Sequence, residues 1–255
     1  MKRIAIYGKG GIGKSTTASN VAAALAMRGL AVMQIGCDPK ADSTRALTGG
    51  KPVTSVLDSI RKNGMDVALE EIVTKGSFGV LCVEAGGPTP GVGCAGRGII
   101  TAFETLERLD AYGIYRPDVV IYDVLGDVVC GGFAMPIRDG YARDVFIVTS
   151  GEKMSMYAAG NIALAVDNFK ARGYARCAGL ILNCRDVENE RELVESFADS
   201  IESRVIGVIP RDGLVQEAEN RGLTVVEAFP ESSMAKAYED LASTMLELSR
   251  EAEDD

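Results

Sequence analysis

The chain has 255 residues, 47% of them hydrophobic and 6% aromatic, which is enough apolar material for one α/β domain or two small ones. No linker interrupts the sequence, so we expect a single domain over residues 1–255. No apolar run approaches the about 18 residues that span a bilayer, and the net charge of −9 disfavours binding to phosphodiester backbones. We therefore expect a cytoplasmic protein that binds neither membrane nor nucleic acid.

Short β-branched apolar runs alternate with helical stretches along the whole chain. Strands are predicted at residues 3–7, 31–36, 79–83, 119–124, 145–148, 179–183 and 205–209. The clearest helices are an alanine-rich stretch at 15–28 and an amphipathic stretch from Met234 to Leu248. This alternation predicts the α/β class, with a mostly parallel sheet flanked by helices and with ligands at the carboxyl ends of the strands.

A glycine-rich loop at residues 8–15 directly follows the first predicted strand and matches the eight-residue P-loop pattern. Its glycines let backbone N–H groups face phosphates, Lys14 can reach the terminal phosphates, and Ser15 can hold Mg²⁺. The alternative is a glycine-rich turn that binds no ligand. The predicted contacts of ATP with this loop are Gly8, Lys9, Gly10, Gly11, Ile12, Gly13, Lys14, Ser15 and Thr16.

Lys9 is a second cation inside the loop, at a position where the general P-loop pattern requires no particular residue. Taken alone, it is equally an ordinary solvated lysine. The loop resembles that of the signature-lysine, or deviant Walker A, class of P-loop NTPases, in which this lysine reaches the nucleotide of the other subunit. The resemblance implies that Lys9 acts in trans, as a catalytic residue, within a homodimer.

Four acidic residues follow predicted strands at the same edge of the sheet. Asp123 ends an apolar strand, which is the Walker B arrangement that places a carboxylate beside the Mg²⁺ of a P-loop. Asp38 and Asp42 follow the second strand, and Asp127 follows Asp123. In the alternative interpretation, Asp42 caps a helix and Asp127 is a turn residue.

Six cysteines and no histidine restrict the metal chemistry of the chain. Cys94 and Cys130 lie in glycine-flanked loops, whereas Cys82, Cys184 and Cys177 are expected in the core. Cys37 beside Asp38 is ambiguous. A four-iron cluster needs four thiolates, so a two-fold dimer would supply two from each chain and hold one cluster on its axis. A redox pair formed by Cys94 and Cys130, or plain glycine-rich turns, would also fit.

Four long motifs, at residues 7–17, 36–44, 91–98 and 122–136, occur in order and resemble those of the nitrogenase iron protein family, and the similarity continues to Tyr238. This resemblance implies that Cys94 and Cys130 bind a 4Fe-4S cluster. It also implies that Asp38 and Asp42 belong to a first nucleotide switch, and Asp123 and Asp127 to a second. The residues that match the adenine-side contacts of the family are Asn183, Pro210, Arg211 and Asp212. Arg97 matches a docking-surface arginine that some members have ADP-ribosylated, and is otherwise an ordinary surface arginine.

The resemblance implies an ATP-dependent electron-transfer reductase: a homodimer with one bridging cluster, which takes electrons from a ferredoxin or flavodoxin and passes them to a nitrogenase-like catalytic partner. Two rival functions share the phosphate loop. A partitioning ATPase should carry a basic patch or tail, but residues 251–255 are acidic. A scaffold ATPase for cluster assembly should carry a Cys-x-x-Cys pair, and the sequence has none.

The identity of the partner is a separate prediction. Nitrogenase iron proteins usually continue well beyond the position of Tyr238, whereas this sequence stops at Asp255. We therefore expect, by a small margin, the nickel-sirohydrochlorin reductive cyclase as partner, with nitrogenase itself as the alternative. The loop at 93–98 resembles that of both systems, and resembles the protochlorophyllide reductase less.

Overall fold

The computed structural model describes residues 1–87, 95–126, 135–138, 140–170 and 175–250. Its centre is an eight-stranded sheet with the strand order β3-β4-β2-β5-β1-β6-β7-β8. All neighbouring strands are parallel except β3 and β4. The strands are β1 Lys2–Gly8, β2 Val32–Gly36, β3 Thr74–Lys75, β4 Leu81–Glu84, β5 Val119–Asp123, β6 Asp144–Thr149, β7 Arg176–Asn183 and β8 Val205–Ile209.

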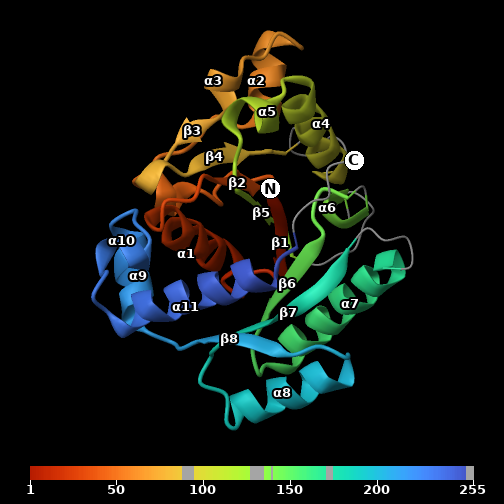
Figure 1. The fold of residues 1–255 in the computed structure, drawn as a ribbon, viewed down its shortest axis with the longest axis vertical. Helices are drawn as coiled ribbons and strands as arrows, with labels where there is room; N and C mark the ends of the chain where they lie inside the picture. Colours follow the sequence, from red (N-terminus) through yellow and green to blue (C-terminus); the bar gives the residue numbers. More distant parts are fainter. Residues whose placement is uncertain (88–94, 127–134, 139, 171–174, 251–255) are drawn as a thin grey trace.

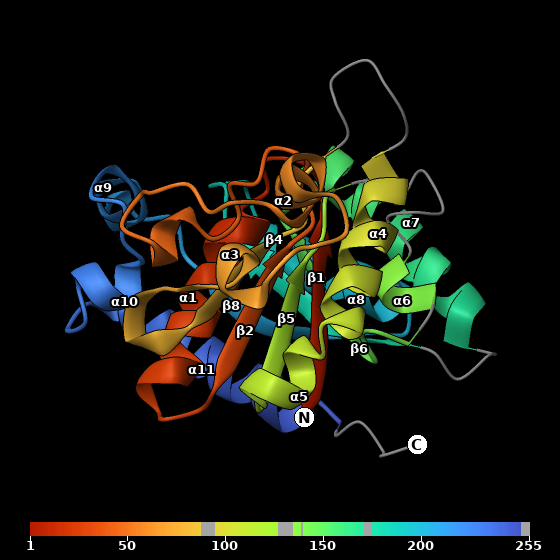
Figure 2. The same cartoon turned by 90° about the horizontal axis from the view of Figure 1, so that it is seen from above.

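Helices cover both faces of this sheet (Figures 1 and 2). On one side lie α1 Lys14–Met27, α9 Gly213–Asn220, α10 Val225–Ala228 and α11 Ser233–Leu248. On the other side lie α4 Ala95–Arg108, α6 Met135–Arg138, α7 Lys153–Lys170 and α8 Glu190–Ser200. The shorter elements toward the β3 end of the sheet are η1 Arg45–Leu47, α2 Val56–Asn63, α3 Leu69–Ile72, η2 Ser77–Gly79 and α5 Ala111–Tyr115.

Each face of the sheet has its own hydrophobic core, because alternate side chains of a strand point to opposite faces. In β1, Ile4 and Ile6 belong to the core on the α1 and α11 side, whereas Ala5 and Tyr7 belong to the core under α4 and α7. All four side chains are fully buried. Burial on both faces explains why the strands are nearly continuous apolar runs in the sequence.

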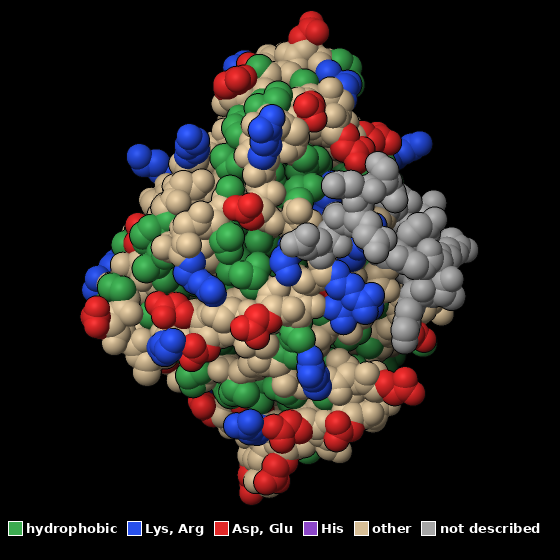
Figure 3. Space-filling view, viewed as in Figure 1, with side chains coloured by type: hydrophobic (Ala, Val, Ile, Leu, Met, Phe, Trp, Pro, Cys, Tyr) green, Lys and Arg blue, Asp and Glu red, His purple; other side chains and the backbone are tan. Residues whose placement is uncertain are grey.

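The predicted fold class is confirmed, and all seven predicted strands are present with ends shifted by a few residues at most. The helix predicted at 15–28 is α1, and the terminal amphipathic helix is α11. Strand β3 was not predicted, because only two residues form it. Within the described residues, no helix is both long and apolar enough to cross a lipid bilayer. On the face in Figure 3, acidic and basic side chains lie interspersed.

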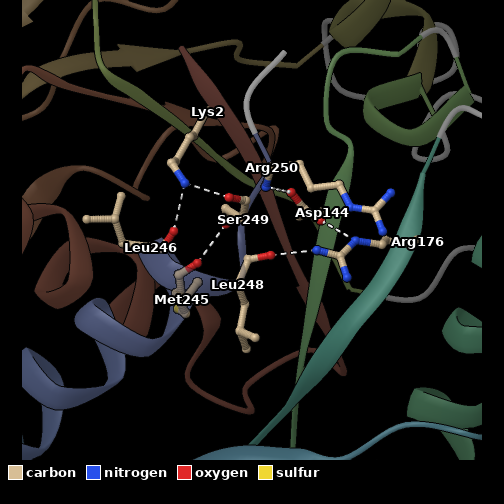
Figure 4. Close-up of polar contacts among 8 residues, drawn as sticks. All are labelled: Lys2, Asp144, Arg176, Met245, Leu246, Leu248, Ser249 and Arg250. Carbon is tan, nitrogen blue, oxygen red and sulfur yellow. Dashed lines mark hydrogen bonds and ion pairs between the residues drawn. The ribbon is translucent and has the colours of Figure 1, made fainter. Parts of the chain in front are cut away.

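The end of α11 is held against the sheet by a group of polar contacts around Asp144 (Figure 4). Asp144 is fully buried, and its two carboxylate oxygens accept hydrogen bonds from Arg176 Nε at 2.8 Å and from the backbone N–H of Arg250 at 2.7 Å. Lys2 Nζ donates to the carbonyl oxygens of Leu246 and Ser249. These contacts join the beginnings of β1, β6 and β7 to the segment that follows α11.

Replacement of Asp144 by alanine is expected to lower the free energy of unfolding by about 3 kcal/mol, because it leaves Arg176 without its buried partner. Urea denaturation would measure the change. Asp240→Ala is the matched control, because Asp240 forms an exposed pair with Lys236 on α11 and its loss should cost about 0.5 kcal/mol or less. Equal destabilisation by the two substitutions would contradict this account.

Candidate functional site

The phosphate loop connects β1 to α1 in a backbone conformation that requires glycine at two positions. Gly8 has φ 151° and packs against the carbonyl of Val148, so that a side chain at position 8 would collide with it. Gly13 has φ 100°, and an added Cβ would lie 2.5 Å from Asn183 Nδ2. The loop closes with a hydrogen bond from the N–H of Ile12 to the carbonyl of Lys9 at 3.2 Å. This shape leaves the N-terminus of α1 directed into the loop, as a phosphate site requires.

The two lysines of the loop occupy different environments. Lys14 is only 7% exposed at the start of α1, and its Nζ donates a hydrogen bond to the carbonyl oxygen of Lys9 at 3.1 Å. The ammonium group therefore lies inside the loop, where phosphate oxygens would bind. Lys9 is half-buried, and its side of the loop lines a cavity of about 360 Å³ together with Glu152, Arg185 and Arg211.

Asp123, the last residue of β5, is 3% exposed and provides a candidate Mg²⁺ ligand. Its Oδ2 accepts a hydrogen bond from Ser43 Oγ at 2.6 Å, whereas its Oδ1 has no hydrogen-bond partner among the described residues. Burial raises the pKa of Asp123, and the hydroxyls of Ser15 and Ser43 and the charge of Lys14 oppose that rise. A buried carboxylate oxygen in these surroundings fits a Mg²⁺ ion that takes its other ligands from Ser15, phosphates and water.

A cavity of about 600 Å³ lies beside the phosphate loop, at the carboxyl ends of β7 and β8. Asn183 ends β7, and its Nδ2 donates to the carbonyl oxygen of Ile12 at 2.6 Å. Asp212 caps α9 by accepting a hydrogen bond from the N–H of Leu214 at 2.9 Å. The cavity brings together seven residues predicted to contact the nucleotide: Gly11, Gly13, Thr16, Asn183, Pro210, Arg211 and Asp212. It has the position and size for the base and sugar of a nucleotide whose phosphates lie in the loop.

The segment between β2 and η1 carries Asp38 and Asp42 to the same edge of the sheet. Asp38 Oδ1 accepts a hydrogen bond from the N–H of Lys40 at 2.9 Å, and Asp42 is exposed. Asp42 is not a helix cap, because Thr44 occupies the N-cap position of η1 and makes no side-chain capping bond there. The direct contact with Asp123 comes instead from Ser43, a residue that the sequence analysis missed.

Glu84 is a second buried acid that the sequence analysis missed, although it directly follows a predicted strand, and it is the last residue of the observed β4. It is fully buried, and its Oε1 accepts hydrogen bonds from the N–H and the hydroxyl of Thr44, both at 2.7 Å. In the sheet register, Gly36 pairs with Asp123 on one side and with Glu84 on the other. A side chain at position 36 would collide with Glu84 Oε2, so the glycine leaves the space between the two acids for Ser43.

Burial raises the pKa of Glu84 from an ordinary value of 4.5 to about 7, opposed by the hydrogen bonds from Thr44 and assisted by the charges of Asp123 and Asp42. Because the folded protein then binds this proton more tightly than the unfolded chain, the free energy of unfolding should decrease as pH rises from about 4.5 to 7. The expected loss from this residue is about 3 kcal/mol.

Denaturation with urea at a series of pH values would measure this dependence. Glu84→Gln should flatten the profile above pH 5, because glutamine does not ionise. Glu104→Gln replaces an exposed glutamate of α4 and serves as the control. A Glu84→Gln profile as steep as that of the unsubstituted protein would contradict the prediction.

The cysteines that the structure describes are poor candidates for metal ligands. Cys37 and Cys82 are fully buried, and burial raises the pKa of both thiols, that of Cys82 to about 12. Burial also raises the pKa of Cys177 and Cys184, which are half-buried. Cys177 and Cys184 pack against the core under α4 and α7, and Cys184 also lines the nucleotide-sized cavity. Cys37 and Cys82 belong to the two hydrophobic cores, so a cluster shared between two subunits could not reach them.

Three predicted site residues, Cys94, Cys130 and Asp127, lie outside the described residues. Arg97 is exposed on the first turn of α4. Among the residues that the structure does describe, no group of three or more Cys, Asp or Glu side chains could hold a metal ion. One further residue of the site had no sequence signal: Arg185, whose Nη2 donates to the carbonyl oxygen of Gly11 at 2.8 Å.

The parallel sheet and the phosphate loop together define a P-loop NTPase. A sequence profile described as "4Fe-4S iron sulfur cluster binding proteins, NifH/frxC family" matches residues 2–252. The chain belongs to this family. A nitrogenase iron protein from Methanospirillum hungatei is 55% identical over 249 residues, which make up 96% of this chain and 88% of that protein. Membership implies a 4Fe-4S cluster, MgATP, a homodimer and a catalytic partner component.

Solved structures show that the fold is more widely shared. The cell division ATPase MinD of Pyrococcus furiosus has a TM-score of 0.73 and 23% identity, over 97% of this chain and 100% of that one. Cobyrinic acid a,c-diamide synthase from Mycobacterium smegmatis, with ADP and magnesium bound, has a TM-score of 0.69 and 22% identity, over 96% of this chain and 94% of that one. At such identities the likeness shows the fold alone, and it does not favour the partitioning ATPase over the iron–sulfur family.

Proposed function

We propose that this protein is the ATP-hydrolysing electron-transfer reductase of a nitrogenase-like complex, and that the residues identified above carry out this function. The observation that carries the proposal is the buried carboxylate of Asp123, on which Lys14 and Ser15 act and one oxygen of which accepts no hydrogen bond from the described residues. Asp123 begins a segment that reaches Cys130 seven residues later. A change at the nucleotide would thereby reach a cluster ligand over a very short length of chain.

We assign the nucleotide contacts as follows. Lys14 and the backbone N–H groups of residues 8–16 hold the phosphates, and Ser15 and Asp123 hold Mg²⁺. Lys9 acts on the nucleotide of the partner subunit, and Asp38, Asp42 and Asp127 respond to the terminal phosphate as switch residues. The cavity lined by Asn183, Pro210, Arg211 and Asp212 receives the base and sugar.

We assign the cluster ligands to Cys94 and Cys130 from each of two subunits. The support comes from Cys37 and Cys82, which are fully buried in the cores, and from the described residues as a whole, among which no group of three or more Cys, Asp or Glu side chains could hold a metal ion. A 4Fe-4S cluster bound in this way supplies a one-electron carrier of low potential. Arg97, exposed close to Cys94 in sequence, belongs to the surface that docks the catalytic partner.

We further propose that the chain works as one domain in the cytoplasm, takes electrons from a ferredoxin or flavodoxin, and needs neither membrane nor nucleic acid. The preference for the nickel-sirohydrochlorin reductive cyclase as catalytic partner stays a prediction. Nitrogenase is the second candidate, supported by the 55% identity to a nitrogenase iron protein.

Reconstitution under anaerobic conditions tests both the proposed activity and the proposed catalytic partner. The purified, iron-loaded protein would be mixed with MgATP, dithionite and either the cyclase component with its nickel tetrapyrrole or a dinitrogenase component with acetylene. We expect product in one mixture, dependent on MgATP hydrolysis. Product with the dinitrogenase alone would overturn the cyclase preference, and a protein without iron or ATPase activity would overturn the proposed function.

A further inference from the structure

The segment Glu84–Gly87 begins at the last residue of β4 and leads toward Cys94. It packs against residues 36–44, the segment that carries Asp38 and Asp42. Its first contact is made by Glu84. Oε1 of this residue holds both the N–H and the hydroxyl of Thr44, two residues beyond Asp42 and next to Ser43, the residue bonded to Asp123. One carboxylate oxygen therefore fixes the end of the segment that carries the first group of switch residues.

Two further contacts join the same pair of segments. The N–H of Ala85 donates to the carbonyl oxygen of Gly36 at 2.8 Å. Gly87 lies directly on Pro39, such that a Cβ at position 87 would be 2.8 Å from Pro39 Cα and closer still to Pro39 Cβ. All of the residues 84–87 are buried. The two segments therefore touch at the beginning, middle and end of this stretch, and displacement of one requires displacement of the other.

Packing alone does not explain an acid at position 84. A fully buried carboxylate costs free energy, and Oε2 of Glu84 has no hydrogen-bond partner among the described residues. An apolar side chain of similar volume would fill this space at lower cost. A carboxylate or an amide, unlike an apolar side chain, provides an acceptor for the two donors of Thr44.

We propose that Glu84–Gly87 is a second mechanical connection between the nucleotide and the cluster, parallel to the connection from Asp123 to Cys130, and that Glu84 is the positioning residue that makes it. This inference rests on the proposed function, because it takes Cys94 as a cluster ligand. A displacement of residues 36–44 on ATP binding would pull on Glu84 through Thr44 and thus on the chain that leads, ten residues later, to Cys94.

The test measures how strongly MgATP changes the environment of the cluster, independently of any partner enzyme. The iron-loaded homodimer is mixed with an iron chelator, with and without MgATP, and the ratio of the two rates of iron release is recorded together with the cluster's paramagnetic signal. We expect Glu84→Ala to bind iron and, at a saturating concentration of MgATP, to lower this ratio about five-fold or more, as for the loss of a typical allosteric coupling. Glu84→Gln keeps an acceptor for Thr44 and should retain the ratio of the unsubstituted protein.

A second variant disturbs the same connection without touching Glu84. Gly87→Ala should also lower the ratio, because the new Cβ collides with Pro39. Gly160→Ala in α7 is the matched control, since an added Cβ there meets only Phe197, at 3.7 Å. Asp144→Ala controls for the loss of a buried carboxylate, because Asp144 lies at the opposite edge of the strands, and it should destabilise the protein without changing the ratio.

The outcomes separate the inference from the proposed function. An unsubstituted protein that binds no iron, or whose iron release ignores MgATP, would overturn both. An unsubstituted protein that responds to MgATP, together with Glu84→Ala and Gly87→Ala variants that respond equally, would overturn the second connection alone. If the ratio fell as much for Asp144→Ala as for Glu84→Ala, the effect of Glu84→Ala would reflect a general loss of stability. This outcome would also overturn the second connection.

Discussion

Lys14→Met is expected to lower the rate of ATP hydrolysis, and with it electron transfer to any partner, by about 10²–10³-fold. The ammonium group of Lys14 is buried inside the phosphate loop, and its charge acts on Asp123, the candidate Mg²⁺ ligand. Methionine keeps the length and apolar character of the side chain, so the start of α1 should remain folded. Phosphate release and nucleotide binding by calorimetry would measure the effect.

The control for this substitution is Lys51→Met, which removes the same charge from an exposed position. It should leave ATP hydrolysis unchanged. Iron content should be normal in both variants, because neither lysine is assigned to the cluster. A Lys14→Met protein that hydrolyses ATP within about three-fold of the unsubstituted rate would contradict the role given to the loop, since such a factor corresponds to less than 1 kcal/mol.

Cys94→Ala and Cys130→Ala are each expected to abolish stable binding of the 4Fe-4S cluster. In a symmetric dimer, either substitution removes two of the four thiolates that such a cluster requires. Iron and sulfide analysis, visible absorbance and the low-temperature paramagnetic signal would each report the loss. ATP binding should persist, because the phosphate loop and Asp123 are unchanged.

Cys177→Ala is the matched control for the loss of a cysteine. The Cys177 thiol contacts Ser203 Oγ at 3.5 Å and is half-buried in β7, away from the phosphate loop. This variant should keep the iron content of the unsubstituted protein. A full cluster in Cys94→Ala, or iron loss in Cys177→Ala equal to that in Cys94→Ala, would contradict the assignment of the ligands.

The fold could be predicted because its strands are buried on both faces. Such strands leave continuous apolar runs in the sequence, and β1, β5 and β6 were recognised in this way within a residue or two of their observed ends. Strand β3 could not be recognised, since both of its residues, Thr74 and Lys75, are exposed and polar. It pairs with β4 at the edge of the sheet, and only the tertiary structure determines that pairing.

The site was predictable wherever consecutive residues carry the chemistry. The phosphate loop and Asp123 belong to short motifs, and their backbone geometry follows from the motif itself. Ser43, Glu84 and Arg185 reach the site only because distant parts of the chain meet at one edge of the sheet, and their spacing in the sequence contains no sign of this. The position of Cys184 at the cavity could not be predicted for the same reason, since the cavity forms only when β7 and β8 are adjacent.

The glycine at position 36 has a consequence for how this sequence can change over time. Because a side chain there would occupy the space of Glu84 and Ser43, position 36 is not free to vary while both of these residues are present. Alanine at 36 needs both a shorter residue at 84, which would release Thr44, and a shift of Ser43, whose Cβ lies 2.5 Å from the added Cβ. We expect substitutions at these two positions to be strongly non-additive, as for other contacting residues. The lineage that carries this chain would therefore have to change position 84 before, or together with, position 36.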